Sequence, residues 1–182
     1  MMTIDLSQQI QTTFVTDGNP DMPYRIPTSL AFGEGDEAVE FLHASDLAAI
    51  GNALIERDPQ RFGHLASFHI AYLWRAKGGT PGGKPKFGMC QRPSGLLKFF
   101  SGVDFVVWLA ADNCREHGLS NYQIEALVYH ELLHAGVTDD FKPTIWPHDF
   151  QAFRAEIETY GAWQTDLQLA QRSFEQLRLN LN

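Results

Sequence analysis

Two histidines and a glutamate stand close together in the second half of the sequence, as His130-Glu131-Leu132-Leu133-His134. On a helix this HExxH pattern places residues i and i+4 on one face, about one turn apart. Both imidazoles can then bind one ion, and Zn²⁺ takes such nitrogens at about 2.0–2.1 Å while keeping a position for water. Glu131 would accept the proton of the activated water. The pattern therefore predicts a zinc-dependent hydrolytic site.

The motif supplies two protein ligands, so a third must come from elsewhere in the chain. His148 is the first candidate, because the residues that separate it from His134 can fold it back to the ion. Glu156 is the second, but on one helix the two lie about 12 Å apart along the axis and cannot share an ion. Asp140 occupies the third-ligand position of HExxHxxGxxH, yet Val137 replaces the glycine which that pattern needs for its turn. We therefore expect His148 as the ligand, with Glu156 holding a ligand's ring N–H or carrying a solvated charge.

Two tyrosines near these residues could assist a reaction. Tyr129 precedes the motif directly and Tyr160 lies in the predicted helix that follows it. Either hydroxyl could polarise a substrate carbonyl or stabilise an oxyanion. Tyrosines in such places are more often core or rim aromatics, and both readings stay open.

The motif must lie on a helix, and the sequence marks both ends of one. Ser120 with Gln123 forms a capping box at its start, and Gly136 stands where a left-handed residue commonly ends a helix. The apolar, β-branched run 103–111 predicts a strand before it, and the alternating aromatic run 65–74 predicts another. Residues 84–91 are expected to return from that strand as a hairpin.

Helical patterns flank these strands on both sides. Apolar spacing predicts an amphipathic helix over 36–56, broken near Ala44–Ser45, and further helices over 149–163 and 165–179. Residues 1–33 carry turn signals and should be partly irregular. This order of elements predicts an α+β fold with helices packed on a small antiparallel or mixed sheet. A peptide could add to an edge of that sheet, either at 84–91 or at 103–111.

Composition narrows the classes of partner. The chain has 182 residues and a formal charge of −8, which argues against a broad nucleic-acid surface. No apolar run approaches the about 20 residues of a membrane span, and the N-terminus lacks the pattern of a secretory signal. We therefore expect a cytoplasmic protein that meets a protein or peptide and no membrane; oligomeric state stays open.

A family resemblance rests on several segments. FHIAYLWR (68–75), the glycine- and lysine-bearing 83–90, DFVVWLA (104–110), ALVYHELLHAG (126–136) and PHDFQAFRAEIETYGAW (147–163) resemble the putative phage metallopeptidase family, relatives of the SprT-like zinc peptidases. SprT-like proteins carry their third ligand as a histidine past the motif, with a phenylalanine after it. His148 with Phe150 and Phe153 is similar, whereas the usual DNA-binding extensions have no visible counterpart.

The resemblance covers about 67–163, and residues 1–60 and the tail after Trp163 lie outside it. We expect a zincin-like domain over 61–182, with 1–60 as an N-terminal extension and helix packed on it, the whole forming one compact domain. The resemblance implies one zinc ion, held by His130, His134 and His148, and a metalloendopeptidase that is phage-encoded and acts in the host cytoplasm. The alternative is a zincin-like protein that keeps the metal, lacks catalysis and binds a host or virion protein. A purely structural zinc is a third, weaker hypothesis.

Overall fold

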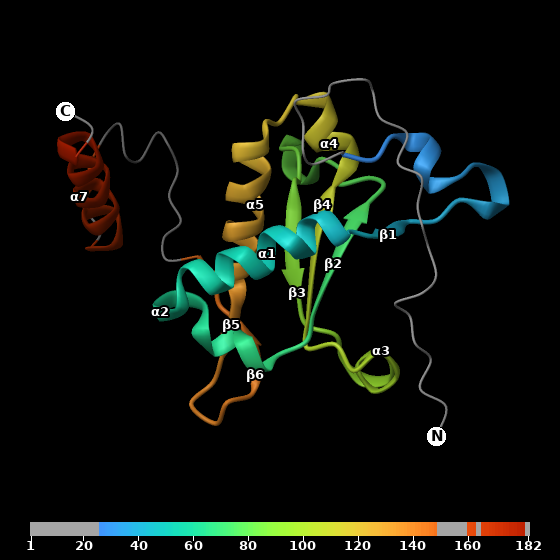
Figure 1. Ribbon diagram of the computed structural model, residues 1–182. Helices are drawn as coiled ribbons and strands as arrows, with labels where there is room; N and C mark the ends of the chain where they lie inside the picture. Colours follow the sequence, from blue (N-terminus) through green and yellow to red (C-terminus); the bar gives the residue numbers. More distant parts are fainter. Residues whose placement is uncertain (1–25, 149–159, 163–164, 181–182) are drawn as a thin grey trace. The chain divides into compact units, whose positions relative to one another are not determined.

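The computed structural model describes residues 26–148, 160–162 and 165–180. Contacts within the chain divide it into Met1–Trp146 and Pro147–Asn182. The helices and strands of the first unit are, in order, 3-10 turns η2 (Ser29–Phe32) and η3 (Gly35–Glu37), β1 (Phe41–His43), α1 (Ser45–Arg57), α2 (Pro59–Phe62), η4 (Gly63–Ser67), β2 (Ile70–Arg75), η5 (Pro81–Gly83), β3 (Gly88–Gln91), α3 (Gly95–Ser101), β4 (Phe105–Ala110), α4 (Ala111–Glu116), α5 (Asn121–His134), β5 (Ala135–Val137) and β6 (Pro143–Ile145) (Figure 1).

Four strands form a mixed sheet in the order β1-β2-β4-β3. Strand β4 pairs in parallel with β2 and antiparallel with β3, and β1 is antiparallel to β2. The predicted hairpin is therefore wrong, because β3 pairs with β4 and not with β2. The sequence FVVWLA of β4 is apolar throughout and buried at five of its six residues, and such a strand is stable only between two others. Strand β3 consequently lies at an edge of the sheet.

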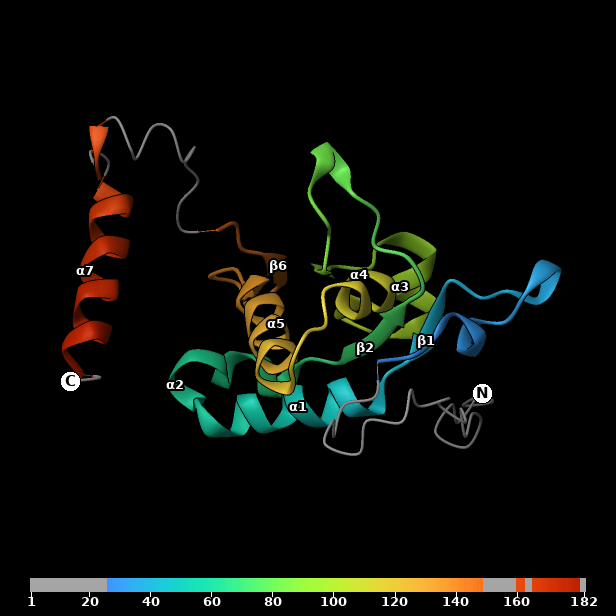
Figure 2. The ribbon, with the colours of Figure 1, turned by 90° about the horizontal axis from the view of Figure 1, so that it is seen from above.

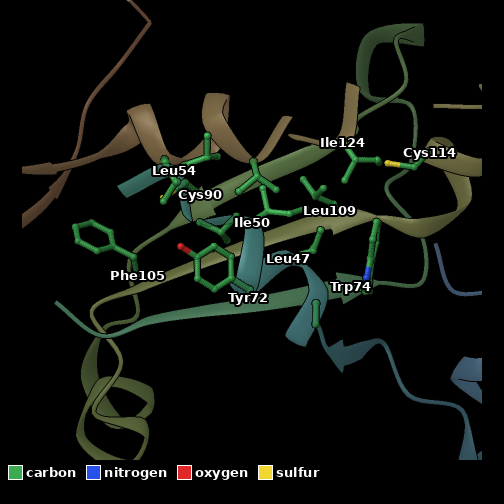
Figure 3. Close-up of a cluster of buried hydrophobic side chains, with 14 of the residues drawn as sticks. Leu47, Ile50, Leu54, Tyr72, Trp74, Cys90, Phe105, Leu109, Cys114 and Ile124 are labelled. Carbon is green, nitrogen blue, oxygen red and sulfur yellow. The ribbon is translucent and has the colours of Figure 1, made fainter. Parts of the chain in front are cut away.

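The core forms where α1 and α5 pack on these strands. Helix α1 contacts β2 and α5, and α5 contacts β3 and β4. Each element contributes apolar side chains at the spacing of its own geometry, every second residue in the strands and every third or fourth in the helices. Figure 3 shows part of this cluster, which includes Leu47, Ile50, Leu54, Tyr72, Trp74, Phe105, Leu109 and Ile124. Helix α5 is thereby fixed against the edge strand.

The helix predicted over 36–56 is correct only in its second half. The chain breaks where the sequence suggested, and α1 begins at Ser45. Before the break the residues form η3 and the short strand β1, because Leu42 is buried when β1 pairs with β2. The carboxylate of Asp46 accepts the backbone N–H of Leu47 and the indole N–H of Trp74, which fixes the start of α1 to β2.

The second unit contains α7 (Thr165–Asn180), close to the predicted helix 165–179. The helix predicted over 149–163 falls mostly on residues outside the described part of the chain. Among the helices that the structure describes, none is both long and apolar enough to cross a bilayer. The predicted boundary between residues 60 and 61 stays a prediction.

Candidate metal centre

Helix α5 begins at a capping box, as the sequence predicts. The Ser120 hydroxyl accepts the Gln123 backbone N–H, and the Gln123 side chain accepts the Ser120 backbone N–H at 2.9 Å. Its buried face carries Ile124, Val128 and Leu132, which anchor the helix in the core. This anchoring determines where the remaining face points, and His130 and His134 lie on that face.

Three imidazoles come together at the end of α5. Nitrogen atoms of His130, His134 and His148 all lie within 4.8 Å of one another, so the group could hold a metal ion. The rings of His130 and His134 are 5.1 Å apart and nearly perpendicular. A tetrahedral ion with bonds of about 2.0–2.1 Å holds its ligand nitrogens about 3.4 Å apart. The donor set and its spacing therefore fit a zinc ion after small side-chain movements.

A hairpin that follows α5 holds the second of these histidines. Strands β5 and β6 pair antiparallel, and the Trp146 backbone N–H donates to the His134 carbonyl at 2.8 Å. The Nδ1 atom of His134 lies 2.6 Å from the Trp146 carbonyl oxygen. A carbonyl only accepts, so Nδ1 carries the proton and Nε2 presents its lone pair to a cation. Such outer hydrogen bonds orient metal ligands.

Trp146 is itself fixed by two neighbours. Its ring lies 5.1 Å from the ring of His64, whose Nε2 donates to the Ala135 carbonyl at 2.9 Å. A Cβ on Gly136 would come within 2.3 Å of the Trp146 indole, so only glycine allows this packing. The prediction that Gly136 ends the helix in a left-handed conformation is wrong. The helix ends at His134, and Gly136 is a β5 residue that admits the indole.

Glu131 lies on α5 between the two helical histidines and points to the edge strand. Its side chain is buried, with 5% of its surface exposed, and it accepts a hydrogen bond from the Cys90 backbone N–H. A Cβ on Gly88 would lie 2.7 Å from its Oε1 atom, so the absence of a side chain there makes room for the carboxylate.

The electrostatics of Glu131 follow from this position. Burial raises the pKa of its carboxyl to about 7, while the His134 charge, the Cys90 hydrogen bond and the Lys86 charge oppose the shift. A carboxylate with a pKa near neutrality can both accept and return a proton at cellular pH. A bound cation would lower this pKa, because it favours the ionised form.

The other predicted residues have different surroundings. The Tyr129 ring packs edge to face on Phe62 at 5.1 Å and borders the core. Tyr160 is 73% exposed, and Glu156 lies outside the described residues. Sequence reasoning did not find Trp146 and His64, because their roles depend on a hairpin that has no motif. The sequence signal for this hairpin is Gly136 just after the motif, followed by a single tryptophan, Trp146.

Comparison with known sequence families gives a match that covers most of the chain. The sequence model of the family described as putative phage metallopeptidase matches residues 39–171, which include the sheet, α5 and all three histidines. No curated protein and no solved structure gives a match.

Proposed function

Because this chain belongs to the putative phage metallopeptidase family, we propose that it is a zinc-dependent endopeptidase with its active centre at the three histidines. The observation that carries the proposal is the group His130, His134 and His148, whose ligand atoms lie within 4.8 Å of one another, next to a buried carboxyl on the same helix. Family membership implies a protein substrate.

Each residue of the centre has a separate role. His130, His134 and His148 would hold the ion, and the Trp146 carbonyl keeps the His134 ring in the tautomer that can bind it. A zinc ion in this place supplies a Lewis acid that polarises a carbonyl and lowers the pKa of water. Glu131 accepts the proton of the attacking water and later delivers it to the leaving amine.

The edge strand β3 offers a place for the substrate backbone. The Ala110 N–H donates to the Phe87 carbonyl, so in the antiparallel alternation Gly88 and Cys90 turn their backbone groups away from β4. The Cys90 N–H reaches Glu131 on that side. Because the Cys90 N–H is bonded to Glu131, a peptide would pair with the other outward groups of β3 and would run past the carboxylate. Of the two edges left open by the sequence, only β3 qualifies, since β4 is interior.

The decisive experiment compares the wild type with Glu131→Gln and His148→Ala. We expect one zinc per chain in the wild type and in Glu131→Gln by inductively coupled plasma mass spectrometry, and much weaker zinc binding in His148→Ala. Cleavage of an unfolded protein should fall at least about 100-fold in Glu131→Gln, the usual effect of losing a general base.

Two outcomes would contradict the proposal. If the wild type contains no zinc after expression with zinc, the chain is not a zinc protein. If Glu131→Gln cleaves as fast as the wild type, Glu131 is not the general base. A wild type that holds zinc and cleaves nothing would instead favour the non-catalytic binding protein.

A further inference from the structure

Acidic and basic residues are strongly segregated along this chain. Residues 59–103 contain seven of the fourteen Lys and Arg residues and no Asp or Glu. The rest of the chain holds the other seven basic and all 22 acidic residues, a formal charge of −15. The overall charge of −8 therefore conceals a segment of +7. This segment includes the edge strand β3 and the loop that leads into it.

The loop between β2 and β3, residues 76–87, is held at its base. Asn113 donates from its side chain to the carbonyls of Gly79 and Lys86, at 3.0 and 2.8 Å. The Gly78 N–H donates to the Asp112 carboxylate at 2.9 Å. Beyond this base the loop extends away from the neighbouring elements, as Figure 2 shows for the light green segment between β2 and β3. The chain thus presents a projecting loop directly before the strand that passes Glu131.

The basic residues of the segment differ in how their charge is balanced. Arg61, Arg75 and Lys98 each pair with a carboxylate. Lys77 and Lys84 are exposed, and among the described residues no ion pair involves them or Lys86. Three lysine charges on one loop are therefore not neutralised by an ion pair with any carboxylate in the described part of the chain.

Lys86 connects this loop to the candidate centre. Its Nζ lies 5.3 Å from the Trp108 ring and 3.3 Å from the Met89 sulfur, which holds it beside β3 on the face of the sheet opposite Cys90 and Leu109. Its charge also acts on Glu131. A substrate strand along β3 that passes Glu131 would thus have the three lysines on one side of the scissile bond.

We propose that the substrate is an acidic polypeptide segment, whose Asp or Glu side chains on one side of the scissile bond pair with Lys77, Lys84 and Lys86. This inference rests on the proposed function, because it assigns the substrate class of the same centre. A short acidic segment would meet only the loop and β3. A long polyanion such as nucleic acid would also meet the charge of −15 on the rest of the chain, which opposes its binding.

The test uses matched peptides that share one cleavable core and carry Asp, Ser or Lys residues on one side or the other. Exposed charge pairs each change affinity by a few-fold at most. With three lysines, we expect the zinc-loaded wild type to prefer the Asp peptide over the Ser peptide by about tenfold in kcat/KM, on one side only, and less at high salt. The Lys77→Glu/Lys84→Glu variant should lose or reverse this ratio.

Lys142→Glu is the matched control. Lys142 is exposed outside the basic segment and pairs with Asp140 at 3.6 Å, so its reversal should keep the wild-type ratio of Asp to Ser peptides. Equal rates for the two peptides in the wild type, or an unchanged ratio after reversal at Lys77 and Lys84, would overturn the proposal.

A binding measurement separates this proposal from the proposed function. Fluorescence anisotropy of labelled peptides with Glu131→Gln needs no cleavage, and the Asp peptide should bind about tenfold more tightly than the Ser peptide. If that preference appears while the wild type cleaves neither peptide, the chain binds acidic peptides but is not a peptidase. If a labelled oligonucleotide binds through Lys77 and Lys84 and the Asp peptide shows no preference, the acidic-peptide proposal fails.

Discussion

Replacing Glu131 with glutamine should stabilise the metal-free protein at neutral and alkaline pH. The folded state raises the pKa of this carboxyl from 4.5 to about 7, mainly through burial. Between these values the folded chain binds a proton that the unfolded chain has released. The free energy of unfolding therefore falls as pH rises from the lower value to the upper one, and it stays lowered above.

The size of the effect follows from the same shift. Each pKa unit corresponds to about 1.4 kcal/mol, so the full change for a shift from 4.5 to about 7 is about 3.5 kcal/mol. Glutamine has the same shape, carries no charge and keeps an oxygen that can accept the Cys90 N–H. The stability of Glu131→Gln relative to the wild type should thus increase by about 3 kcal/mol between pH 4.5 and pH 8.

Urea denaturation with a chelator present, followed by circular dichroism at several pH values, measures this difference. Groups that titrate in both proteins cancel in the comparison. Excess zinc should reduce the pH dependence, because a cation at the histidines favours the carboxylate. A difference that stays constant within about 0.5 kcal/mol across the range would refute the electrostatic reasoning for Glu131.

Three further substitutions test the construction of the site. Gly88→Ala should place a methyl group against the Glu131 carboxylate. We expect a lower kcat/KM and a loss of about 1–3 kcal/mol in the free energy of unfolding measured with urea. Unchanged kinetics would contradict the close approach of Gly88 to Glu131. Gly136→Ala should displace the Trp146 ring and weaken zinc binding about 10- to 100-fold in a chelator competition, and unaltered affinity would show that the indole does not orient the ligand. Ser120→Ala should lower stability by about 1 kcal/mol through loss of the cap, with kcat/KM retained if the cap only stabilises the helix.

Local signals in the sequence predicted the part of the site that lies on α5. The capping box at Ser120 and the spacing of His130 and His134 depend only on helix geometry, which neighbouring residues specify. The run that became β4 was equally clear because it is apolar throughout. The length of the intervening chain and the family resemblance favour His148, and the structure brings it to the other two histidines.

Features that depend on distant partners were not predictable in the same way. Residues 36–43 carry a helical apolar pattern, but β2 offers Leu42 a strand partner and a place in the core. Residues 84–91 resemble the return strand of a hairpin. However, β1 and β4 occupy both sides of β2, so β3 pairs with β4 instead. Gly136 looks like a helix end, and its real role is visible only with Trp146 in place. In each case a tertiary contact outweighed the local preference.

The two hydrogen bonds between Trp146 and His134 connect ion binding to local unfolding. Opening of the β5–β6 hairpin would break the bond at the His134 ring and the bond at its backbone carbonyl together. A ligand that requires the closed hairpin therefore stabilises it, by about 2.7 kcal/mol when free zinc is 100 times its dissociation constant. Amide hydrogens of residues 135–146 should exchange about 100-fold more slowly in the loaded protein. If the protein degrades polypeptides as proposed, this coupling would also protect its own hairpin from digestion whenever the ion is bound.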